Sequence, residues 1–141
     1  MTEKELEALF RRSLGAHYSG KCKLWKHHAD MFTGAGHPDF YGFVKGKFVA
    51  FELKVAPNRF SDLQKTSIRG TCELGGFAAG VLWCDEKAWL LPVIATNIFS
   101  YRNRTFWLPL PSMTIYGPNS SSPGLNLSAL DVLLFPPKVT T

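Results

Sequence analysis

The sequence predicts an α/β fold in which a small mixed sheet is flanked by helices. Three observations lead to this class. A helical apolar pattern opens the chain, two strand-like runs joined by a Gly-containing turn follow it, and a capped helix then leads into a short apolar run. An order of helix, two or three strands, helix and strand suits one sheet with helices packed against it.

The first helix is expected over Thr2 to Leu14. Its apolar stripe repeats every three or four residues, as in an amphipathic helix, and consists of Leu6, Leu9, Phe10 and Leu14. Its polar face carries Glu3, Glu7, Arg11 and Arg12. On this pattern alone, Glu7 could be a solvated partner of Arg11 one turn later.

The next two runs, 39–44 and 47–54, predict a β-hairpin whose turn is Lys45-Gly46. A two-residue turn there pairs residues whose numbers sum to 91, so Asp39 would lie directly opposite Glu52. The second strand alternates as a half-buried strand does. One face would carry Val49, Phe51 and Leu53, and the other would carry Ala50, Glu52 and Lys54.

Two facing carboxylates, Asp39 and Glu52, favour a metal site. Opposed side chains of an antiparallel pair have Cβ atoms roughly 4.5–5.5 Å apart, and two like charges there are destabilising unless a cation neutralises them. Carboxylate oxygens suit Mg²⁺ or Mn²⁺, and the ammonium of Lys54 could polarise a water. The pattern therefore indicates metal-assisted phosphodiester hydrolysis. A surface hairpin with an ion pair between Glu52 and Lys54 is the alternative.

A second helix is expected to begin at Ser61. The sequence Ser61-Asp-Leu-Gln64 fits a capping box, in which Gln64 reaches back to the cap amide. Gly75-Gly76 would end this helix, and the apolar run 79–84 then suits a buried strand. Local capping alone could therefore explain both Ser61 and Gln64.

Pro38-Asp39 followed by Glu52-Leu53-Lys54 resembles the signature of the PD-(D/E)xK nuclease superfamily. Two branches of it are similar in the neighbouring sequence: the VRR-NUC nucleases, and the RecU-type and archaeal Holliday junction resolvases. The stretches that carry this similarity are residues 34–40, 48–54 and 60–64. The resemblance covers about residues 3–92, and it implies a restriction-endonuclease-like core.

The resemblance also implies a set of catalytic residues, which in chain order are Glu7, Asp39, Glu52, Lys54 and Gln64. The three carboxylates would bind Mg²⁺ or Mn²⁺, Lys54 would assist the attacking water, and Gln64 would be a supporting amide. Glu3 is the alternative to Glu7, because position on the helix alone does not choose between them.

A net charge of +5 and a pI near 9.2 favour an anionic partner, and nucleic acid is the obvious one for a phosphodiesterase. Each lysine or arginine that is a candidate for binding DNA could equally be a solvated surface charge. His27-His28 could be metal ligands or core residues, but the four histidines show no ligand spacing, so a zinc nuclease ranks below the magnesium enzyme. The candidate DNA-binding residues are Lys21, Lys23, Lys26, Arg59, Lys65 and Arg69.

The three cysteines show no CxxC spacing, which indicates neither a disulfide framework nor a zinc site. A reducing, cytoplasmic location is therefore expected, and the resemblance implies a bacterial, archaeal or viral origin. No apolar run approaches the roughly 20 residues that a bilayer-spanning helix needs, so no membrane partner is expected.

The chain has 141 residues, 45% of them hydrophobic, which is enough for one core. We expect a single nuclease domain over 1–141, with its core at about 3–92 and an apolar extension at 93–141. The extension could complete the core or form a subunit interface. A homodimer is expected, as in RecU-type resolvases, since two-fold symmetry suits paired cuts in a four-way junction. The segment 117–124 is typical of a mobile loop.

The sequence thus predicts a Mg²⁺-dependent endodeoxyribonuclease that is selective for branched DNA, like a Holliday junction resolvase, and that serves DNA recombination or repair. A general nicking or restriction-like nuclease of the VRR-NUC type is an alternative within the same class. A non-catalytic nucleic-acid-binding subunit and a scaffold that binds protein through the C-terminal segments are alternatives from other classes.

Overall fold

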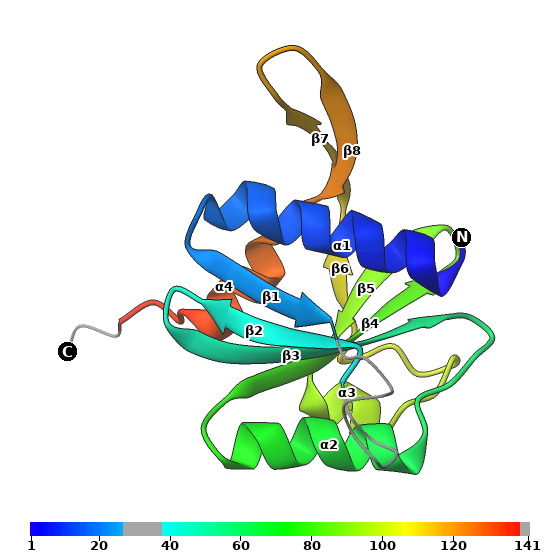
Figure 1. Ribbon diagram of the computed structural model, residues 1–141. Coiled ribbons are helices and arrows are strands. Elements are labelled where there is room, and N and C mark those ends of the chain that lie inside the picture. Colours follow the sequence, from blue (N-terminus) through cyan, green and yellow to red (C-terminus); the bar gives the residue numbers. More distant parts are fainter. Residues whose placement is uncertain (27–37, 139–141) are drawn as a thin grey trace.

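The computed structural model describes residues 1–26 and 38–138 (Figure 1). In chain order the elements are α1 (Glu3–Tyr18), β1 (Cys22–Lys26), β2 (Phe40–Val44), β3 (Lys47–Val55), α2 (Asp62–Glu73), β4 (Phe77–Cys84), β5 (Lys87–Leu91), α3 (Val93–Asn97), β6 (Leu108–Leu110), β7 (Ser112–Tyr116), β8 (Ser121–Leu125) and α4 (Ser128–Leu134). None of the described helices is long and apolar enough to cross a membrane.

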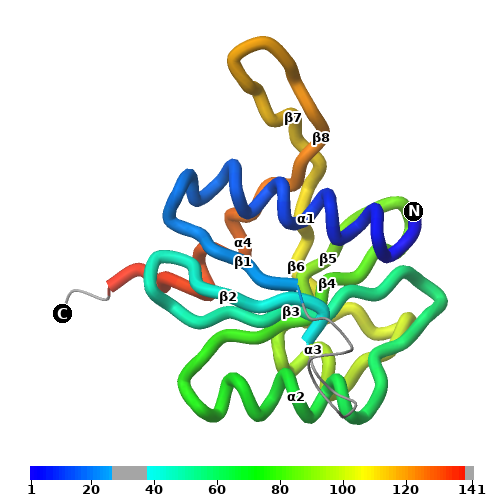
Figure 2. Tube along the Cα trace, viewed as in Figure 1, coloured from blue at the N-terminus to red at the C-terminus, as the bar shows by residue number. Residues whose placement is uncertain are grey.

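The larger sheet has six strands in the order β1-β2-β3-β4-β5-β6. Its neighbouring strands run antiparallel except for β3 and β4, which are parallel and are connected in the chain through α2. The predicted fold class, a small mixed sheet flanked by helices, is therefore confirmed. Strands β7 and β8 form a separate two-stranded hairpin that stands out from the body of the fold (Figure 2).

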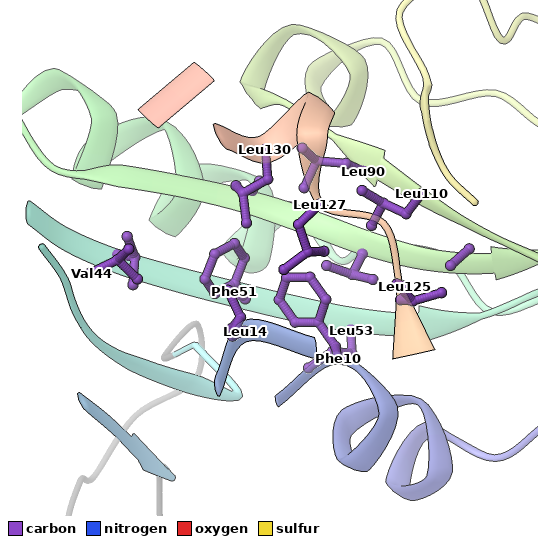
Figure 3. Packing of buried hydrophobic residues seen from close by; sticks show 14 of the residues in the cluster. Phe10, Leu14, Val44, Phe51, Leu53, Leu90, Leu110, Leu125, Leu127 and Leu130 are labelled. Carbon is purple, nitrogen blue, oxygen red and sulfur yellow. The ribbon is translucent and has the colours of Figure 1, made fainter. Parts of the chain in front are cut away.

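Helices α1 and α2 cover opposite faces of the sheet (Figure 1). On one face, the buried α1 residues Phe10 and Leu14 pack in the same cluster as Phe51 (Figure 3). On the other face, Ile68 of α2 packs with Ala50. The prediction that the strand over 47–54 is half-buried is wrong, because the two helices exclude water from both faces of β3. The fully covered stretch of β3 is Val49, Ala50, Phe51, Glu52 and Leu53.

The turn between β2 and β3 has the predicted position and register. Lys45 and Gly46 have φ angles of 49° and 82°, and positive φ at both central residues is what the tight hairpin turn with a matching strand twist requires. The ladder runs from Val44 opposite Lys47 to Phe40 opposite Phe51, so every described pair sums to 91. The turn residues therefore set which side chains of the two strands meet.

Both predicted helices are confirmed, and the first begins with a capping box that the sequence analysis did not predict. Thr2 caps α1: its hydroxyl accepts from the Glu5 amide at 3.1 Å, and the Glu5 carboxylate accepts from the Thr2 amide at 3.1 Å. The helix continues a turn beyond the predicted end at Leu14, to Tyr18. Tyr18 is buried, and its hydroxyl donates to Asp131 of α4 at 3.1 Å, so a tertiary contact extends the helix.

The C-terminal third contributes to the same core. Leucines of α4 and of the strands before it lie in the cluster that contains Phe10 and Phe51 (Figure 3). The core-packing interpretation of this apolar segment therefore holds for the residues concerned, which are Leu110, Leu125, Leu127, Leu130 and Leu134.

The prediction of a mobile loop over 117–124 is wrong for its second half. Strand β8 begins at Ser121 and pairs with β7, and the Gly117 amide closes the turn by donating to the Ser120 carbonyl at 2.8 Å. The base of this hairpin is held to α1, because Ser13 Oγ accepts from the Leu125 amide at 2.8 Å. Pairing with β7 and anchoring to α1 supply the order that the local Pro, Gly and Ser composition does not predict.

Candidate active site

Asp39 and Glu52 come together where the β2–β3 ladder ends. The last regular pair is Phe40 with Phe51, and beyond it the Asp39 amide donates to the Phe51 carbonyl at 3.1 Å. Asp39 Oδ2 then accepts from the Leu53 amide at 2.7 Å, in the place of a ladder carbonyl. Asp39 is therefore not a regular ladder partner of Glu52, but its side chain is fixed beside the strand that carries Glu52.

Glu52 is a buried carboxyl group with one satisfied oxygen. The residue is 1% exposed, and its Oε2 accepts from Gln64 Nε2 at 3.0 Å. Its Oε1 is buried and has no hydrogen-bond partner among the described residues. An ionised carboxyl group buried in this way needs further donors, a proton or a cation to be stable.

The environment of Glu52 favours the protonated form. Burial, the largest cause, raises the pKa of Glu52 from its ordinary value of 4.5 to about 9, and the charge and hydrogen bonding of Asp39 act in the same direction. Lys54 and the Gln64 amide lower this pKa but do not offset the burial. Two ionised carboxylates cannot donate to each other, whereas one proton held between them gives the hydrogen bond that the second oxygen lacks.

Gln64 serves the helix and the carboxylate at the same time. Its side-chain oxygen accepts from the Ser61 amide at 2.8 Å, and Ser61 Oγ accepts from the Gln64 amide at 3.1 Å, as the capping box predicts. The opposite end of the same amide, Nε2, donates to Glu52. The capping interpretation and the supporting-amide interpretation of Gln64 are therefore compatible.

Lys54 lies near the two carboxylates but forms its ion pair with α1. Its ammonium is 3.8 Å from Glu3 Oε1, and its side chain is 20% exposed. The alternative of a simple surface ion pair between Glu52 and Lys54 is not found in the described residues, and Glu52 is not on the surface. Lys54 is close enough to lower the pKa of Glu52 through its charge.

A pocket of about 380 Å³ opens beside Asp39 at the start of α1. Glu7 lines it, and the Glu7 carboxylate pairs with Lys26 at 3.2 Å rather than with Arg11. In the described part of the chain, no three His, Cys, Asp or Glu side chains lie close enough together to hold a metal ion. The metal role of Glu7 therefore stays a prediction. The pocket lining consists of Glu3, Lys4, Glu7, Lys26, Pro38, Asp39 and Leu53.

The residues of this site fit a hard divalent cation. Carboxylate and carbonyl oxygens are the ligands that Mg²⁺ and Mn²⁺ prefer, and the unpartnered Oε1 of Glu52 is such an oxygen in a buried position. A cation shared by Glu52 and Asp39 would replace the proton and remove the repulsion between the two carboxylates. Ion binding should therefore compete with protonation of Glu52.

The six candidate DNA-binding residues do not form one cluster. Only Lys26 lines the pocket beside Asp39. Lys23 lies over the Trp25 ring at 6.0 Å and Arg59 over the Tyr101 ring at 5.6 Å. Of the remaining three residues, Lys21 and Arg69 are exposed and Lys65 is half-buried.

Two contributors to the site were missed in the sequence analysis. The Leu53 amide fixes Asp39, and the signal for it was that Asp39 stands just outside a strand end, where the partner strand has an amide without a ladder acceptor. The pairing of Lys26 with Glu7 spans 19 residues and has no local signal. His27-His28 and the motif residues Gly34 to His37 lie outside the described residues.

Comparison with known proteins gives a likeness of fold. No family model matches the chain, and no match is found among curated proteins. Among solved structures, the chain is similar to Hjc of Archaeoglobus fulgidus, described as a Holliday junction resolvase from an archaeal hyperthermophile. The two chains share 16% sequence identity with a TM-score of 0.48, over 77% of this chain and 85% of that chain. At this identity and score, no residue role is transferred from that protein.

Proposed function

We propose that this chain is a nuclease that hydrolyses phosphodiester bonds in DNA, with Mg²⁺ or Mn²⁺ held by Asp39 and Glu52. One observation carries the proposal. The carboxyl group of Glu52 is buried beside Asp39, and one of its oxygens has no hydrogen-bond partner among the described residues. Such an arrangement destabilises a protein unless it holds a proton or a cation, and it is typical of functional sites.

Each side chain has a distinct task in this mechanism. When bound, a divalent cation supplies Lewis-acid stabilisation of the phosphate and lowers the pKa of a nearby water. Asp39 and Glu52 balance its charge, and the Leu53 amide fixes the orientation of Asp39. Gln64 holds Glu52 through Oε2, which leaves Oε1 for the cation.

Lys54 orients the attacking water and offsets the negative charge that develops on the phosphate. Its ammonium rests against Glu3 at 3.8 Å. Because this contact is long and Glu3 is exposed, a phosphate oxygen could compete for the ammonium at little expense in free energy. Glu3 thus pairs with Lys54 until a substrate phosphate takes its place.

The proposal extends to branched DNA as the substrate, to recombination or repair as the process, and to a homodimer as the active form. The sequence resemblance to junction resolvases over 34–40, 48–54 and 60–64 supports these three statements. Two copies related by two-fold symmetry would make paired cuts across a four-way junction. A cytoplasmic location would suit both this substrate and the three free cysteines.

A second candidate is a nucleic-acid-binding subunit without catalysis. The observation that favours it is that the described residues bring no three potential metal ligands together. A general nicking nuclease of the VRR-NUC type is a third candidate, and it shares the mechanism proposed above. These candidates differ in what they do to a defined DNA substrate.

The test is cleavage of a labelled four-way junction beside a linear duplex of the same sequence, in Mg²⁺, with Asp39→Asn as the control. Symmetric junction cuts that the variant loses would establish the proposed activity and substrate. Equal nicking of both substrates would support the general nuclease. Tight binding without any cutting, in Mg²⁺ and in Mn²⁺, would contradict the proposal in favour of the non-catalytic subunit.

A further inference from the structure

Four aromatic side chains share one face of β1, β2 and β3, the face on which Ala50 lies under α2. Trp25 pairs with Tyr41, and Tyr41 pairs in turn with Ala50. Phe43 pairs with Phe48, two positions along the same strands. Paired residues of adjacent strands project to the same face. We call Trp25, Tyr41, Phe43 and Phe48 the aromatic face.

The rings of the aromatic face contact one another as a compact cluster, in which Tyr41 and Phe48 lie 6.3 Å apart. The centroids of Trp25 and Tyr41 are 6.1 Å apart, and those of Trp25 and Phe43 are 6.3 Å apart. Phe43 and Phe48 meet edge to face at 5.7 Å. Contacts of this kind hold each ring in a fixed orientation. The sheet therefore presents a preformed cluster of rings.

Two of these rings are open to solvent, although the opposite face of the same strands is closed. Trp25 is 43% exposed and Phe43 is 45% exposed. Phe40 and Val44, on the other face of β2, are fully buried under α1. Tyr41 and Phe48 are half-buried and pack against the cluster of Ala50, Ile68 and Ala78 under α2, so the exposed rings of the aromatic face are those of Trp25 and Phe43. Neighbouring exposed aromatic rings of this kind mark a binding surface rather than an unfinished core.

The edge strand β1 joins the aromatic face to the carboxylate site. Lys26 lines the pocket beside Asp39, whereas its neighbour Trp25 projects to the opposite face of the sheet. On β2, Tyr41 follows Asp39 by two residues, a rise of about 7 Å. Glu52 lies two residues beyond Ala50 and so shares the face of Tyr41, which allows a polynucleotide whose phosphate lies at Asp39 and Glu52 to place an adjoining base on the aromatic face.

Charge argues that the occupant is a nucleic acid strand. Lys23 pairs with Phe43 and so lies on the same face, with its ammonium 6.0 Å from the Trp25 ring. Rings on which bases stack, flanked by cations that contact phosphates, are how proteins bind single strands. A second copy of the chain is a poorer fit, because a two-fold contact here would bring Lys23 towards its own copy. The two ladders place six side chains on this face, of which Lys23 is the charged one, and Glu52 follows on the same face of β3 two residues beyond Ala50.

We infer that the aromatic face stacks bases of the cut strand that are unpaired at a branch point, so that among branched DNAs the enzyme favours those with single-stranded character there, such as a flap or a splayed arm. This inference rests on the proposed nuclease function. In a fully paired duplex the bases are already stacked on each other and cannot reach the rings. Single-stranded character next to the cut would therefore select the substrate.

The test measures DNA binding in an Asp39→Asn background, in which the substrate stays intact. Fluorescence anisotropy would give the affinities for a single-stranded oligonucleotide, a splayed-arm duplex and a blunt duplex of equal length. Trp25→Ala and Phe43→Ala remove one exposed ring each, and Trp25→Phe keeps a ring. Tyr116→Ala is the matched control, because Tyr116 is 82% exposed on the β7–β8 hairpin. Circular dichroism would verify that each variant is folded.

We expect Trp25→Ala and Phe43→Ala each to weaken binding of the single strand and the splayed arm by roughly 5- to 150-fold, the range for loss of one stacked base. Trp25→Phe should retain most of the affinity for both DNAs. Tyr116→Ala should bind all three DNAs as the unsubstituted protein does, and none of the variants should change the affinity for the blunt duplex. Equal losses on all three DNAs, or no loss on any, would overturn the inference. The inference would also be overturned if sedimentation showed a dimer that Trp25→Ala and Phe43→Ala dissociate while their affinity for DNA stays the same.

A separate cleavage assay distinguishes failure of this inference from failure of the proposed function. Cleavage by the wild-type chain that Trp25→Ala leaves unchanged on flap DNA would contradict the inference and leave the nuclease intact. Ring-dependent binding by a wild-type chain that cuts no DNA in Mg²⁺ or Mn²⁺ would support base stacking and contradict the nuclease.

Discussion

Gln64 donates its side-chain amide to Glu52 Oε2 at 3.0 Å, and thereby connects the first turn of α2 to the buried carboxyl group of β3. The same side chain accepts from the Ser61 amide at 2.8 Å through its oxygen. Since both ends of the amide are used, its orientation is determined by the two partners together. The capping box therefore positions a site residue as well as beginning a helix.

Gln64→Ala and Ser61→Ala separate these two tasks. Both changes remove capping bonds and should lower the free energy of unfolding by about 1 kcal/mol. Only Gln64→Ala also removes the donor to Glu52, and it should weaken Mg²⁺ activation of cleavage by about 10- to 100-fold, as loss of a ligand's supporting partner does. Urea denaturation and Mg²⁺ titration of the cleavage rate measure the two effects. Equal loss of activity in Ser61→Ala would contradict a positioning role for Gln64.

Glu52 makes the unfolding free energy depend on pH. Its pKa is raised from 4.5 to about 9 in the folded state, so between these values the folded chain holds a proton that the unfolded chain has released. Stability should fall as pH rises through this window, by up to about 1.4 kcal/mol per pH unit, and level off above it. Glu52→Gln should lose this slope and be more stable than the wild type at pH 8. Thermal unfolding in EDTA from pH 5 to pH 9 gives both curves. Parallel curves would show that Glu52 is not the titrating group.

The sequence was sufficient to predict the β2–β3 hairpin and the capping box of α2, because these features are local. Lys45-Gly46 determines the turn and so the register, and Ser61 with Gln64 lies within a single helical turn. Contacts between distant segments were not predictable in this way. The bond from the Leu53 amide to Asp39 needs the ladder to end at Phe40, which depends on how β1 and β2 pack.

Gly42 allows β1 to pair closely with β2. A Cβ atom built on it would lie 1.8 Å from the Lys23 carbonyl oxygen, whereas one built on Gly15 in α1 would meet nothing within 4 Å. Gly42→Ala should therefore destabilise the fold by about 2 kcal/mol or more and displace β1, and Gly15→Ala should stabilise it by up to about 1 kcal/mol. Urea denaturation of both variants tests this. A stable Gly42→Ala protein with native amide protection in β1 would contradict the described pairing.

The β7–β8 hairpin and strand β1 show where pattern reasoning failed. Pro123 and Gly124 lie inside β8, and both residue types are unfavourable in strands. A Cβ atom at Gly124 would lie 2.4 Å from Cδ1 of Ile115 on the facing strand, so a larger residue there would displace the Ile115 side chain. Strand β1 was missed because the three lysines in the stretch 21–26 indicate a solvent-exposed segment. An edge strand can be exposed to solvent in this way and still pair with one neighbouring strand, as β1 does with β2.

Glu7 and Glu3 can be distinguished by their different partners. Glu7 pairs with Lys26 beside Asp39, and Glu3 pairs with Lys54. If Glu7 joins the metal site, Glu7→Gln should raise the Mg²⁺ concentration needed for half-maximal cleavage by about 10-fold or more. Glu3→Gln should leave this requirement unchanged, because it only frees Lys54. The reverse pattern in Mg²⁺ titrations of the two variants would assign the helix carboxylate to Glu3.

The most direct test of the central claim is calorimetric titration of Mn²⁺ into the wild-type chain, Asp39→Asn and Glu52→Gln at pH 8, in buffers that differ in ionisation enthalpy. We expect the wild type to bind the ion and release a proton, because the pKa of Glu52 is about 9 and the cation must replace its proton. Both variants should bind at least about 10-fold more weakly, and Glu52→Gln should release no proton. Equal Mn²⁺ affinity and equal proton release in all three proteins would contradict a metal site at Asp39 and Glu52.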